Sequence, residues 1–451
     1  MKRGKRLRMQ RQAEETLIKL DYIAAKSRRE PSCKFVNLMY LLSEDFLASC
    51  FRELKKTASP GVDGKRWEDL QADISQHLTR MVDWLKRGQY WPQPVRRVYI
   101  PKDGNSMRPL GIPAIGDKIL QLAMTKILMS IFEASFFPMS YGYRPNRGAL
   151  KALENLNDCL FREPVSTVID ADIKGFFDSV NHEKLMDCLK TRVGDIRFLK
   201  LVERFLKAGV MEEGQYMKTE KGTPQGGILS PVLSNIFLHY ALDRWFVEQI
   251  QPKLSGKAWI FRYADDFVIC VENSEEAEML LDAIRERFSK CDLELSEEKT
   301  RIIPFGRKAW VQYRNGGMRL GTFDFLGFTH YIGKSRKGGY KVGRTTSKKK
   351  FRNALLSMKI WLRGVRNLSI SEWWGLLKAK LRGHYQYYGV SGNSVGINRY
   401  NQSVRQLLYK ALSRRSQRKS ITWDKFTKYL ERYPLPKPSI IHNWYAKPAM
   451  Q

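Results

Sequence analysis

The clearest structural signal in this chain lies in Trp259-Ile260-Phe261-Arg262-Tyr263-Ala264-Asp265-Asp266-Phe267-Val268-Ile269-Cys270-Val271. Apolar and β-branched residues dominate 259–263 and 267–271, which is typical of two strands. Ala264, Asp265 and Asp266 separate the two runs at the distance expected of a tight turn. The pattern therefore predicts a β-hairpin that carries two carboxylates at its tip.

A second strand-like run, residues 166–173, also ends in acidic residues and includes Asp172. Strand ends that meet at one edge of a sheet would bring Asp172 close to Asp265 and Asp266. Magnesium prefers oxygen ligands, and nucleotide transfer needs two Mg²⁺ ions roughly 3.5–4 Å apart. The apolar flanks would bury these carboxylates, where unpaired charge is costly unless a cation neutralises it. An Asp-Asp pair in a turn is common by itself, so the hairpin alone is also open to a purely structural interpretation.

The rest of the chain mixes helical and strand-like patterns. Apolar residues recur at helical spacing in 46–54, 67–85, 118–132, 150–161, 183–189, 196–208, 229–247 and 275–291. Strand-like runs occupy 95–100 and 323–330, and 59–64 forms a Pro/Gly turn. The chain becomes basic and helical from 348 to about 416, and Pro434, Pro436 and Pro438 predict an extended tail. We expect a domain boundary near residue 335.

The chain is strongly basic, with a formal net charge of +33 from 79 Lys and Arg against 46 Asp and Glu. Such an excess indicates a polyanionic partner, and nucleic acid is the first candidate. Residues 331–420 hold 22 Lys or Arg and one acidic residue, Glu372, with aromatic residues interleaved. This segment is expected to lie along phosphates, although a solvated basic surface is the alternative.

The cysteines and the hydropathy pattern exclude several other classes of protein. The six cysteines are scattered without a Cys-x-x-Cys pair, which indicates neither a zinc site nor a disulfide framework. This usage fits a reducing cytosol. No apolar run is long enough to span a bilayer, so a membrane role is not expected.

Five motifs occur in an order that resembles one enzyme family. They are Arg108-Pro109-Leu110-Gly111-Ile112-Pro113, Asp172-Ile173-Lys174-Gly175-Phe176-Phe177-Asp178, Gly222-Thr223-Pro224-Gln225-Gly226-Gly227, Tyr263-Ala264-Asp265-Asp266 and Phe325-Leu326-Gly327-Phe328. The series resembles the reverse transcriptases of group II intron-encoded proteins, over residues 45 to about 440. This resemblance implies an α+β right-hand polymerase. The N-terminal extension and the start of the fingers would occupy 1–90, fingers and palm 91–335, a helical thumb or X domain 336–415, and a short basic DNA-binding tail 416–451.

The resemblance also implies which residues carry the chemistry. It assigns metal binding to Asp172, Ile173 and Asp265, with Asp266 as the third catalytic acid. The incoming nucleotide would be held by Lys102, Arg108, Phe177, Gln225 and Lys299, and the primer end by Phe325, Leu326 and Gly327. The Phe177 ring would clash with a ribonucleotide 2′-hydroxyl, unless it is an ordinary core aromatic. Lys299 would protonate pyrophosphate, unless it is a solvated lysine at a helix end.

By the same resemblance the thumb binds RNA through its cations. The residues implied are Lys348, Lys349, Lys350, Lys378, Lys380, Arg382, Arg414 and Arg415. Basic residues among aromatic residues suit an RNA backbone, although many of these aromatics are expected to pack the helices together. Longer family members end in a zinc-bearing His-Asn-His endonuclease. Residues after 416 contain no paired cysteines, so the chain resembles the compact branch without that domain.

These observations predict an RNA-directed DNA polymerase that copies intron RNA into DNA with two Mg²⁺ ions and binds that RNA to assist splicing and mobility. The expected partners are group II intron RNA, an RNA template with a DNA primer, target DNA and deoxynucleoside triphosphates, and the oligomeric state stays open. The expected setting is a bacterial-type cytoplasm, with association with the nucleoid in use. Two alternatives remain: an RNA-binding maturase with little polymerase activity, and a domesticated reverse transcriptase in DNA repair or CRISPR-type immunity.

Overall fold

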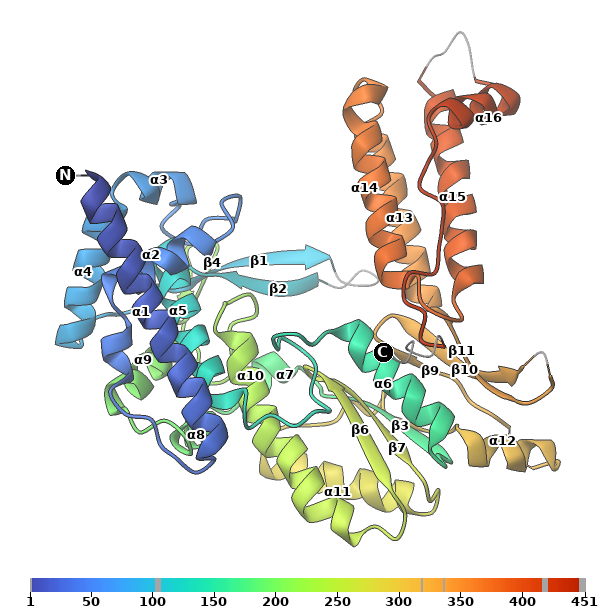
Figure 1. Cartoon of the computed structure of the whole chain (residues 1–451), viewed down its shortest axis with the longest axis horizontal. Coiled ribbons are helices and arrows are strands. Elements are labelled where there is room, and N and C mark those ends of the chain that lie inside the picture. The colour runs from blue at the N-terminus through green and yellow to red at the C-terminus, as the bar shows by residue number, and fades with distance from the viewer. Residues whose placement is uncertain (1, 102–106, 318, 336, 416–420, 446–451) are drawn as a thin grey trace.

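The computed structural model describes residues 2–101, 107–317, 319–335, 337–415 and 421–445, with side chains from residue 15 onward. Figure 1 shows three regions in the arrangement of a right hand. Helices of the N-terminal part lie on one side, a β-sheet with its covering helices lies at the base, and three long helices stand upright on the other side. The β1–β2 hairpin projects from the first region toward the upright helices. This mixed architecture confirms the predicted α+β right-hand fold.

The N-terminal helices and the fingers form the first region. Its helices are α1 (Lys2–Arg29), η1 (Leu38–Leu41), α2 (Glu44–Glu53), α3 (Trp67–Ala72), α4 (Ile74–Arg87) and α5 (Ile115–Phe132). Helix α5 is apolar on almost every side, so the other helices bury it. A four-stranded sheet in the order β2-β1-β4-β5 joins them, built from β1 (Val95–Pro101), β2 (Met107–Ile112), β4 (Val210–Glu212) and β5 (Gln215–Met217). The single helix expected over 67–85 is instead broken at Asp73, whose backbone leaves the helical conformation (φ −115°, ψ 20°).

The palm is a four-stranded antiparallel sheet in the order β6-β7-β3-β8. Its strands are β3 (Thr167–Asp172), β6 (Ala258–Tyr263), β7 (Asp266–Val271) and β8 (Arg301–Pro304). Alternate residues enter two separate cores: Ile169 and Ile269 pack with α11 (Glu276–Lys290), whereas Val168 and Val268 pack with α6 (Ala149–Arg162). Because both faces are buried, the strands read as nearly continuous apolar runs. The predicted hairpin of 259–271 is confirmed.

Helices and a small sheet complete the palm. The helical segments are α7 (Phe176–Ser179), α8 (His182–Lys190), α9 (Ile196–Leu206), α10 (Ser230–Leu238), η2 (His239–Asp243), η3 (Phe246–Ile250), η4 (Gln251–Lys253) and α12 (Arg307–Arg314). The helix expected over 229–247 is therefore α10 extended by two wider π-helical turns. Strands β9 (Phe323–Phe325), β10 (Phe328–Lys334) and β11 (Tyr340–Thr346) form the small sheet. The division predicted near residue 335 falls between the paired strands β10 and β11.

The thumb consists of α13 (Lys348–Gly364), α14 (Ile370–Tyr388) and α15 (Ser394–Ser413), and α16 (Trp423–Arg432) packs at their far end. Ser347 caps α13, because its side chain accepts a hydrogen bond from the Lys350 N–H, and Ser369 and Glu372 form a capping box on α14. Trp373, Leu377 and many other apolar residues make the thumb's own core. No helix in the described ranges combines the length and apolar character that a bilayer crossing needs.

The chain after α16 returns along the thumb to its base, as Figure 1 shows. The Ile441 N–H donates to the Gly389 carbonyl oxygen (2.7 Å), and the Ser391 N–H donates to the His442 carbonyl oxygen (3.0 Å). The guanidinium of Arg344 lies 4.5 Å from the centre of the Trp444 ring. The extended tail expected from the prolines is thus tied to the joint between palm and thumb.

Candidate active site

The catalytic turn joins β6 to β7 through Ala264 and Asp265. Tyr263 and Asp266 are cross-strand partners, so only two residues make the connection. Ala264 has φ +58°, a left-handed conformation that is costly for a residue with a side chain. Gly142 packs so closely beneath the turn that a Cβ atom there would lie 2.5 Å from the Ala264 nitrogen. The surrounding structure therefore holds the strained backbone of Ala264 in place, and with it the position of Asp265.

A buried polar network supports this turn from below. Arg262 and Asp243 are both fully buried, and the Arg262 Nε donates to Asp243 Oδ1 at 2.7 Å. The Arg262 Nη1 also donates to the Ala264 carbonyl oxygen (3.0 Å) and to Asn235 Oδ1 (3.1 Å). Sequence reasoning did not identify Arg262, although an arginine in the middle of an apolar strand was a visible signal. A charge at such a position must be paired when the strand is buried.

Asp172, Asp265 and Asp266 meet at the end of the palm sheet. Asp172 and Asp266 are cross-strand partners on β3 and β7, and Asp265 precedes Asp266. Burial raises the pKa of Asp265, and the nearby Asp172 carboxylate adds to this effect. Burial, with the charges of Asp170, Asp172 and Asp265, raises the pKa of Asp266 to about 7. The site therefore concentrates partly buried negative charge, which a divalent cation would relieve.

A lysine faces this acidic cluster. Lys299 Nζ forms an ion pair and hydrogen bond with Asp172 Oδ2. Over the described residues, no three carboxylate, imidazole or thiolate groups already surround one point as a complete metal site. Ile173 is buried beside the acids and bridges to Leu295, while the Ser296 N–H donates to the Asp172 carbonyl oxygen (2.8 Å). The donor set suits Mg²⁺, with Lys299 neutralising part of the same charge.

The residues predicted to bind the nucleotide come from separate parts of the fold. Phe177 lies on α7 and is half-buried, and Gln225 Nε2 donates to Asp178 Oδ2 (3.3 Å). Arg108 lies on β2 and is exposed, and its positive charge offsets part of the rise in the pKa of Asp265. Lys102 lies outside the described residues. Phe177, Gln225, Asp178 and Gly111 border one pocket of about 430 Å³ between the fingers sheet and the palm.

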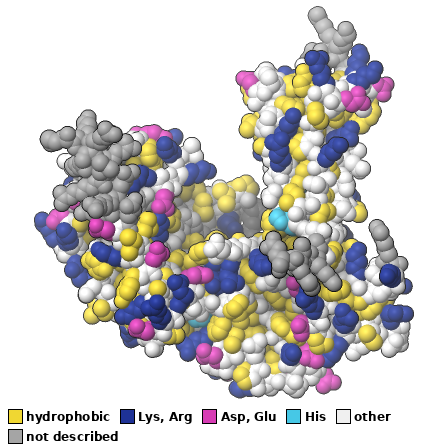
Figure 2. Space-filling model, viewed as in Figure 1, with side chains coloured by type: hydrophobic (Ala, Val, Ile, Leu, Met, Phe, Trp, Pro, Cys, Tyr) yellow, Lys and Arg dark blue, Asp and Glu magenta, His cyan; other side chains and the backbone are white. Residues whose placement is uncertain are grey.

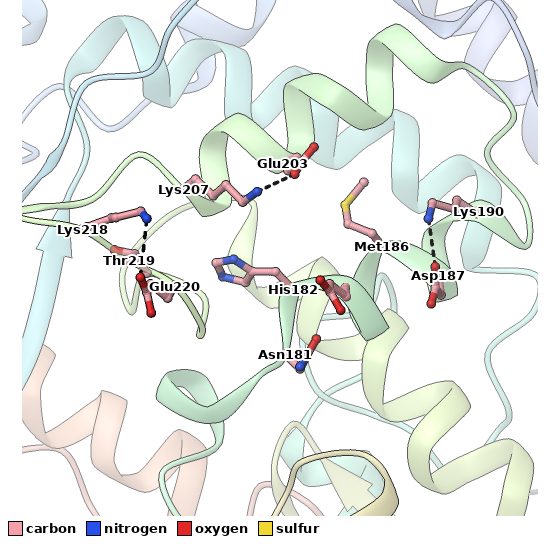
Figure 3. A pocket seen from close by; sticks show the side chains of 11 residues that line it. Asn181, His182, Met186, Asp187, Lys190, Glu203, Lys207, Lys218, Thr219 and Glu220 are labelled. Carbon is pink, nitrogen blue, oxygen red and sulfur yellow. Dashed lines mark hydrogen bonds and ion pairs between the residues drawn. The ribbon is translucent and has the colours of Figure 1, made fainter.

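His182, which sequence reasoning missed, is also bonded to this region. Its Nε2 lies 2.7 Å from the carbonyl oxygen of Gly222, the first residue of the Gly-Thr-Pro-Gln-Gly-Gly motif. Figure 3 shows the His182 ring pointing from the start of α8 toward the segment of Lys218, Thr219 and Glu220. These residues line a pocket of about 830 Å³ that excludes the catalytic acids. The only sequence signal was a histidine following the Phe-Phe-Asp motif by a few residues.

The residues predicted as the primer grip form a tight turn at the foot of the thumb. Phe325 is buried at the end of β9, and Leu326 and Gly327 both have positive φ, at +47° and +83°. The Tyr387 hydroxyl on α14 donates to the Leu326 carbonyl oxygen (2.8 Å). This hydrogen bond fastens the turn to the thumb.

The predicted thumb cations are solvent-accessible, whereas the aromatics among them mostly form the core. Seven of the eight cations are exposed and Lys378 is part-buried. Trp373, Trp374 and Tyr385 are buried in the thumb core. Lys348, Lys349 and Lys350 lie at the base of the thumb, and Arg414 and Arg415 lie at its far end.

Sequence reasoning missed a basic groove between α13 and α15, of about 360 Å³. Its five cations are Lys359, Arg363, Arg366, Lys410 and Arg414, and Leu362, Leu407 and Ala411 form its apolar part. Within the described ranges no carboxylate pairs with any of the five. Both helices end here, but two helix ends offset only about half a charge each. Several positive charges thus remain for an anion. The i, i+4, i+7 spacing of Lys359, Arg363 and Arg366 was the available signal.

Comparison with known proteins agrees with this geometry. Residues 100–330 match the model of the reverse transcriptase (RNA-dependent DNA polymerase) family, and this range contains all five predicted motifs. The chain belongs to the reverse transcriptase family. It is 31% identical to the group II intron-encoded protein LtrA of Lactococcus lactis subsp. cremoris, over 85% of this chain and 75% of LtrA.

Two further relatives have similar identity. Protein YkfC of Escherichia coli (strain K12) is 33% identical, over 76% of this chain and 96% of YkfC. Nuclear intron maturase 4, mitochondrial, of Arabidopsis thaliana is 30% identical, over 29% of this chain and 16% of that protein. The predicted membership in the group II intron-encoded reverse transcriptases is confirmed, and the enzyme is an RNA-directed DNA polymerase.

Proposed function

We propose that this reverse transcriptase copies intron RNA into DNA at the cluster of Asp172, Asp265 and Asp266. The cross-strand pairing of Asp172 with Asp266, beside the half-buried Asp265, is the observation that carries the proposal. Asp172 and Asp265, with Ile173 beside them, would hold two Mg²⁺ ions. Such ions activate the attacking 3′-oxygen of the primer and stabilise the leaving pyrophosphate. Asp266 supports the same site through its charge.

The chain's own residues bind and orient the substrates. Arg108, and Lys102 outside the described residues, have the permanent charge needed to grip a triphosphate. Phe177 presents its ring where a 2′-hydroxyl would clash, and Gln225 lies beneath the new base pair. Lys299, which pairs with Asp172, would supply the proton to pyrophosphate. Phe325, Leu326 and Gly327 hold the primer end against the thumb.

Extension of a DNA primer on an RNA template, with Mg²⁺ and deoxynucleoside triphosphates, tests the polymerase site. Wild type should extend the primer, and Asp265→Asn should lose extension by orders of magnitude because a metal ligand is missing. Asp282→Asn is the matched control, since this carboxylate is 71% exposed on α11 and pairs only with Arg285 nearby. Extension by Asp265→Asn at the control rate would refute the assigned site.

We further propose that the thumb binds the intron RNA and so assists splicing and mobility. The exposed cations and the groove of Lys359, Arg363, Arg366, Lys410 and Arg414 support this proposal. The groove has no aromatic lining, which favours the phosphates of a folded RNA over stacked, unpaired bases. The relatives named for introns and for maturase function make intron RNA the expected ligand. Target DNA, cytoplasmic location and nucleoid association belong to the same proposal.

A salt titration of RNA binding tests the thumb. The triple variant Lys359→Gln, Arg363→Gln and Lys410→Gln should bind a folded intron RNA more weakly. Its slope of log affinity against log salt should be smaller by about one for each phosphate that the variant no longer neutralises. The control is Lys253→Gln, Lys257→Gln and Lys290→Gln on the palm side. Equal losses of affinity in both triple variants would show that total charge, rather than the groove, governs binding.

A further inference from the structure

Two segments of the nucleotide pocket are joined through their backbones. The Gly222 N–H donates to the Val180 carbonyl oxygen (2.7 Å), and the Thr223 N–H donates to the Phe177 carbonyl oxygen (2.6 Å). These bonds connect the segment after Asp172 with the motif that contains Gln225. The relative position of Phe177 and Gln225 therefore depends on the conformation of residues 222–224.

Gly222 lies at this connection, and its lack of a side chain leaves its backbone less restricted than that of the other residues there. It has φ +89°, a region that glycine enters freely and other residues avoid. A Cβ atom at this position would lie 2.8 Å from the Phe177 carbonyl oxygen, so no side chain fits. The close packing requires glycine, and glycine itself does little to restrict rotation of the peptide between residues 222 and 223. Groups outside the loop orient this peptide, and one of them is the Phe177 carbonyl oxygen, which accepts from the Thr223 N–H.

His182 is the side chain that contacts this peptide. Its Nε2 lies 2.7 Å from the Gly222 carbonyl oxygen, and the residue is only 6% exposed. A carbonyl oxygen can only accept, so Nε2 carries the hydrogen, and Nδ1 has no hydrogen-bond partner in the described part of the chain. Burial lowers the pKa of His182, which favours the neutral ring. The histidine therefore acts here as a fixed hydrogen-bond donor.

The conformation of Gly222 is passed on to the rest of the pocket. Thr223, Pro224 and Gln225 follow directly, and Gln225 Nε2 bonds to Asp178. The Gly111 N–H on β2 donates to the Gln225 carbonyl oxygen (2.6 Å), which connects the loop to the strand that carries Arg108. A rotation of the 222–223 peptide would thus shift the residues below the base pair and beside the triphosphate.

We propose that His182 is a positioning residue for the incoming nucleotide, acting through the Gly222 carbonyl. This inference rests on the proposed nucleotide-binding role of Phe177 and Gln225. His182 contacts neither the catalytic acids nor the predicted substrate groups. Its removal should weaken nucleotide binding, while the affinity for primer and template and the folded state persist.

Two substitutions separate the hydrogen bond from the bulk of the ring. Gln places its amide nitrogen near the position of the histidine Nε2, so His182→Gln can keep the bond to Gly222. Asn is shorter and its amide nitrogen corresponds to Nδ1, so His182→Asn cannot reach that carbonyl. Both residues are polar and uncharged. Only the reach of the donor differs between them.

The experiment measures deoxynucleoside triphosphate affinity on a complex of full-length protein, RNA template and a DNA primer ended by a dideoxynucleotide. No bond forms, so the readout is independent of polymerase activity. We expect His182→Asn to weaken nucleotide binding about tenfold, which corresponds to about 1.4 kcal/mol, and His182→Gln to stay within about threefold of wild type. Affinity for the primer–template, measured without nucleotide, should be unchanged in both.

Primer extension and thermal unfolding accompany the binding measurement. In extension assays the loss in His182→Asn should appear mainly in KM for the nucleotide, with a smaller change in kcat. Nucleotide affinity of His182→Asn equal to wild type, or an equal loss in His182→Gln, would overturn the positioning role. A matching fall in Tm and in primer–template affinity would show that His182 is merely structural. Failure of wild type to extend a primer would instead count against the proposed function.

Discussion

The palm and the thumb use charge in opposite ways. In the palm, Arg262 and Asp243 form a fully buried ion pair, and Asp172 pairs with Lys299. In the thumb, residues 337–415 contain one acidic residue, Glu372, and its carboxylate accepts hydrogen bonds from Ser369 at the start of α14. Figure 2 shows Lys and Arg side chains along the thumb on this face of the molecule.

This difference reflects two different tasks. Charges beside the acidic cluster of the palm must hold groups in defined positions, so Arg262 and Asp172 are each fixed by a partner of opposite charge. Charges in the thumb must meet phosphates whose positions vary, so they stay in water on long side chains until the ligand arrives. The task of the palm depends on where its groups are placed, whereas the task of the thumb depends on its affinity for nucleic acid. Substitutions in the two regions should therefore change different measured quantities.

The largest expected effect is on catalysis alone. Asp172→Asn removes a proposed metal ligand, which should slow primer extension about 1,000-fold or more because several kcal/mol of transition-state stabilisation are lost. The affinity of the thumb for folded RNA should change less than about twofold. Filter binding and single-turnover extension on the same preparation measure both. A parallel fall in RNA affinity would break the proposed division between palm and thumb.

The next effect is on the stability of the palm. Arg262→Met leaves Asp243 buried without its partner, which should lower the free energy of unfolding by about 3–5 kcal/mol. The double variant Arg262→Met and Asp243→Leu should recover much of this loss. Arg285→Met is the control, because its ion pairs on α11 are exposed and contribute less than about 1 kcal/mol. Equal losses in the two single variants would contradict the buried-network explanation.

The fingers should lose stability as pH rises. Burial raises the pKa of Asp117, on α5, to about 7. The folded state therefore holds this proton more tightly than the unfolded state, and stability falls as pH increases from about 4 to about 7. Asp117→Asn cannot ionise, so its Tm should depend less on pH in this range.

The thumb should show the opposite pH dependence, because it should lose stability as pH falls. Burial lowers the pKa of His384 on α14 to about 4, and its ring stacks on Tyr400. The unfolded state binds a proton at higher pH than the folded state, so stability falls as pH drops from about 6.5 to about 4. His384→Phe keeps an aromatic ring but cannot ionise, so its stability should depend less on pH in this range. Unfolding curves of wild type and variant at pH 4.5 and 7 test it.

The smallest effect concerns the cap of a thumb helix. Ser369 accepts a hydrogen bond at the first turn of α14, so Ser369→Ala should cost about 1 kcal/mol of local stability. Hydrogen exchange in α14 should increase while exchange in β3 and β7 stays unchanged. Ser357→Ala, at an exposed position within α13 of the same thumb, is the control. Faster exchange in both regions would mean that thumb and palm unfold together.

The sequence by itself determined the class of fold and the convergence of Asp172, Asp265 and Asp266 at one end of a sheet. Local patterns suffice for these features. Strands buried on both faces appear in the sequence as apolar runs, and a two-residue turn is formed by residues adjacent in the sequence. The hairpin of 259–271, the acidic end of β3 and the basic thumb helices were therefore predictable. The break at Asp73 was not, since helix ends depend on packing as well as on propensity. The domain limits and the residue roles remain predictions.

Only the tertiary structure decided which distant residues support the site. Arg262 and Asp243 lie 19 residues apart, and His182 and Gly222 lie 40 apart, yet each pair is in direct contact. Likewise, the five groove cations lie in or just after α13 and α15, two helices separated in the chain by α14. No local pattern encodes such pairs, because their contact depends on where the chain returns after long connections. The acids are visible in the sequence, whereas the groups that position them become visible only after folding.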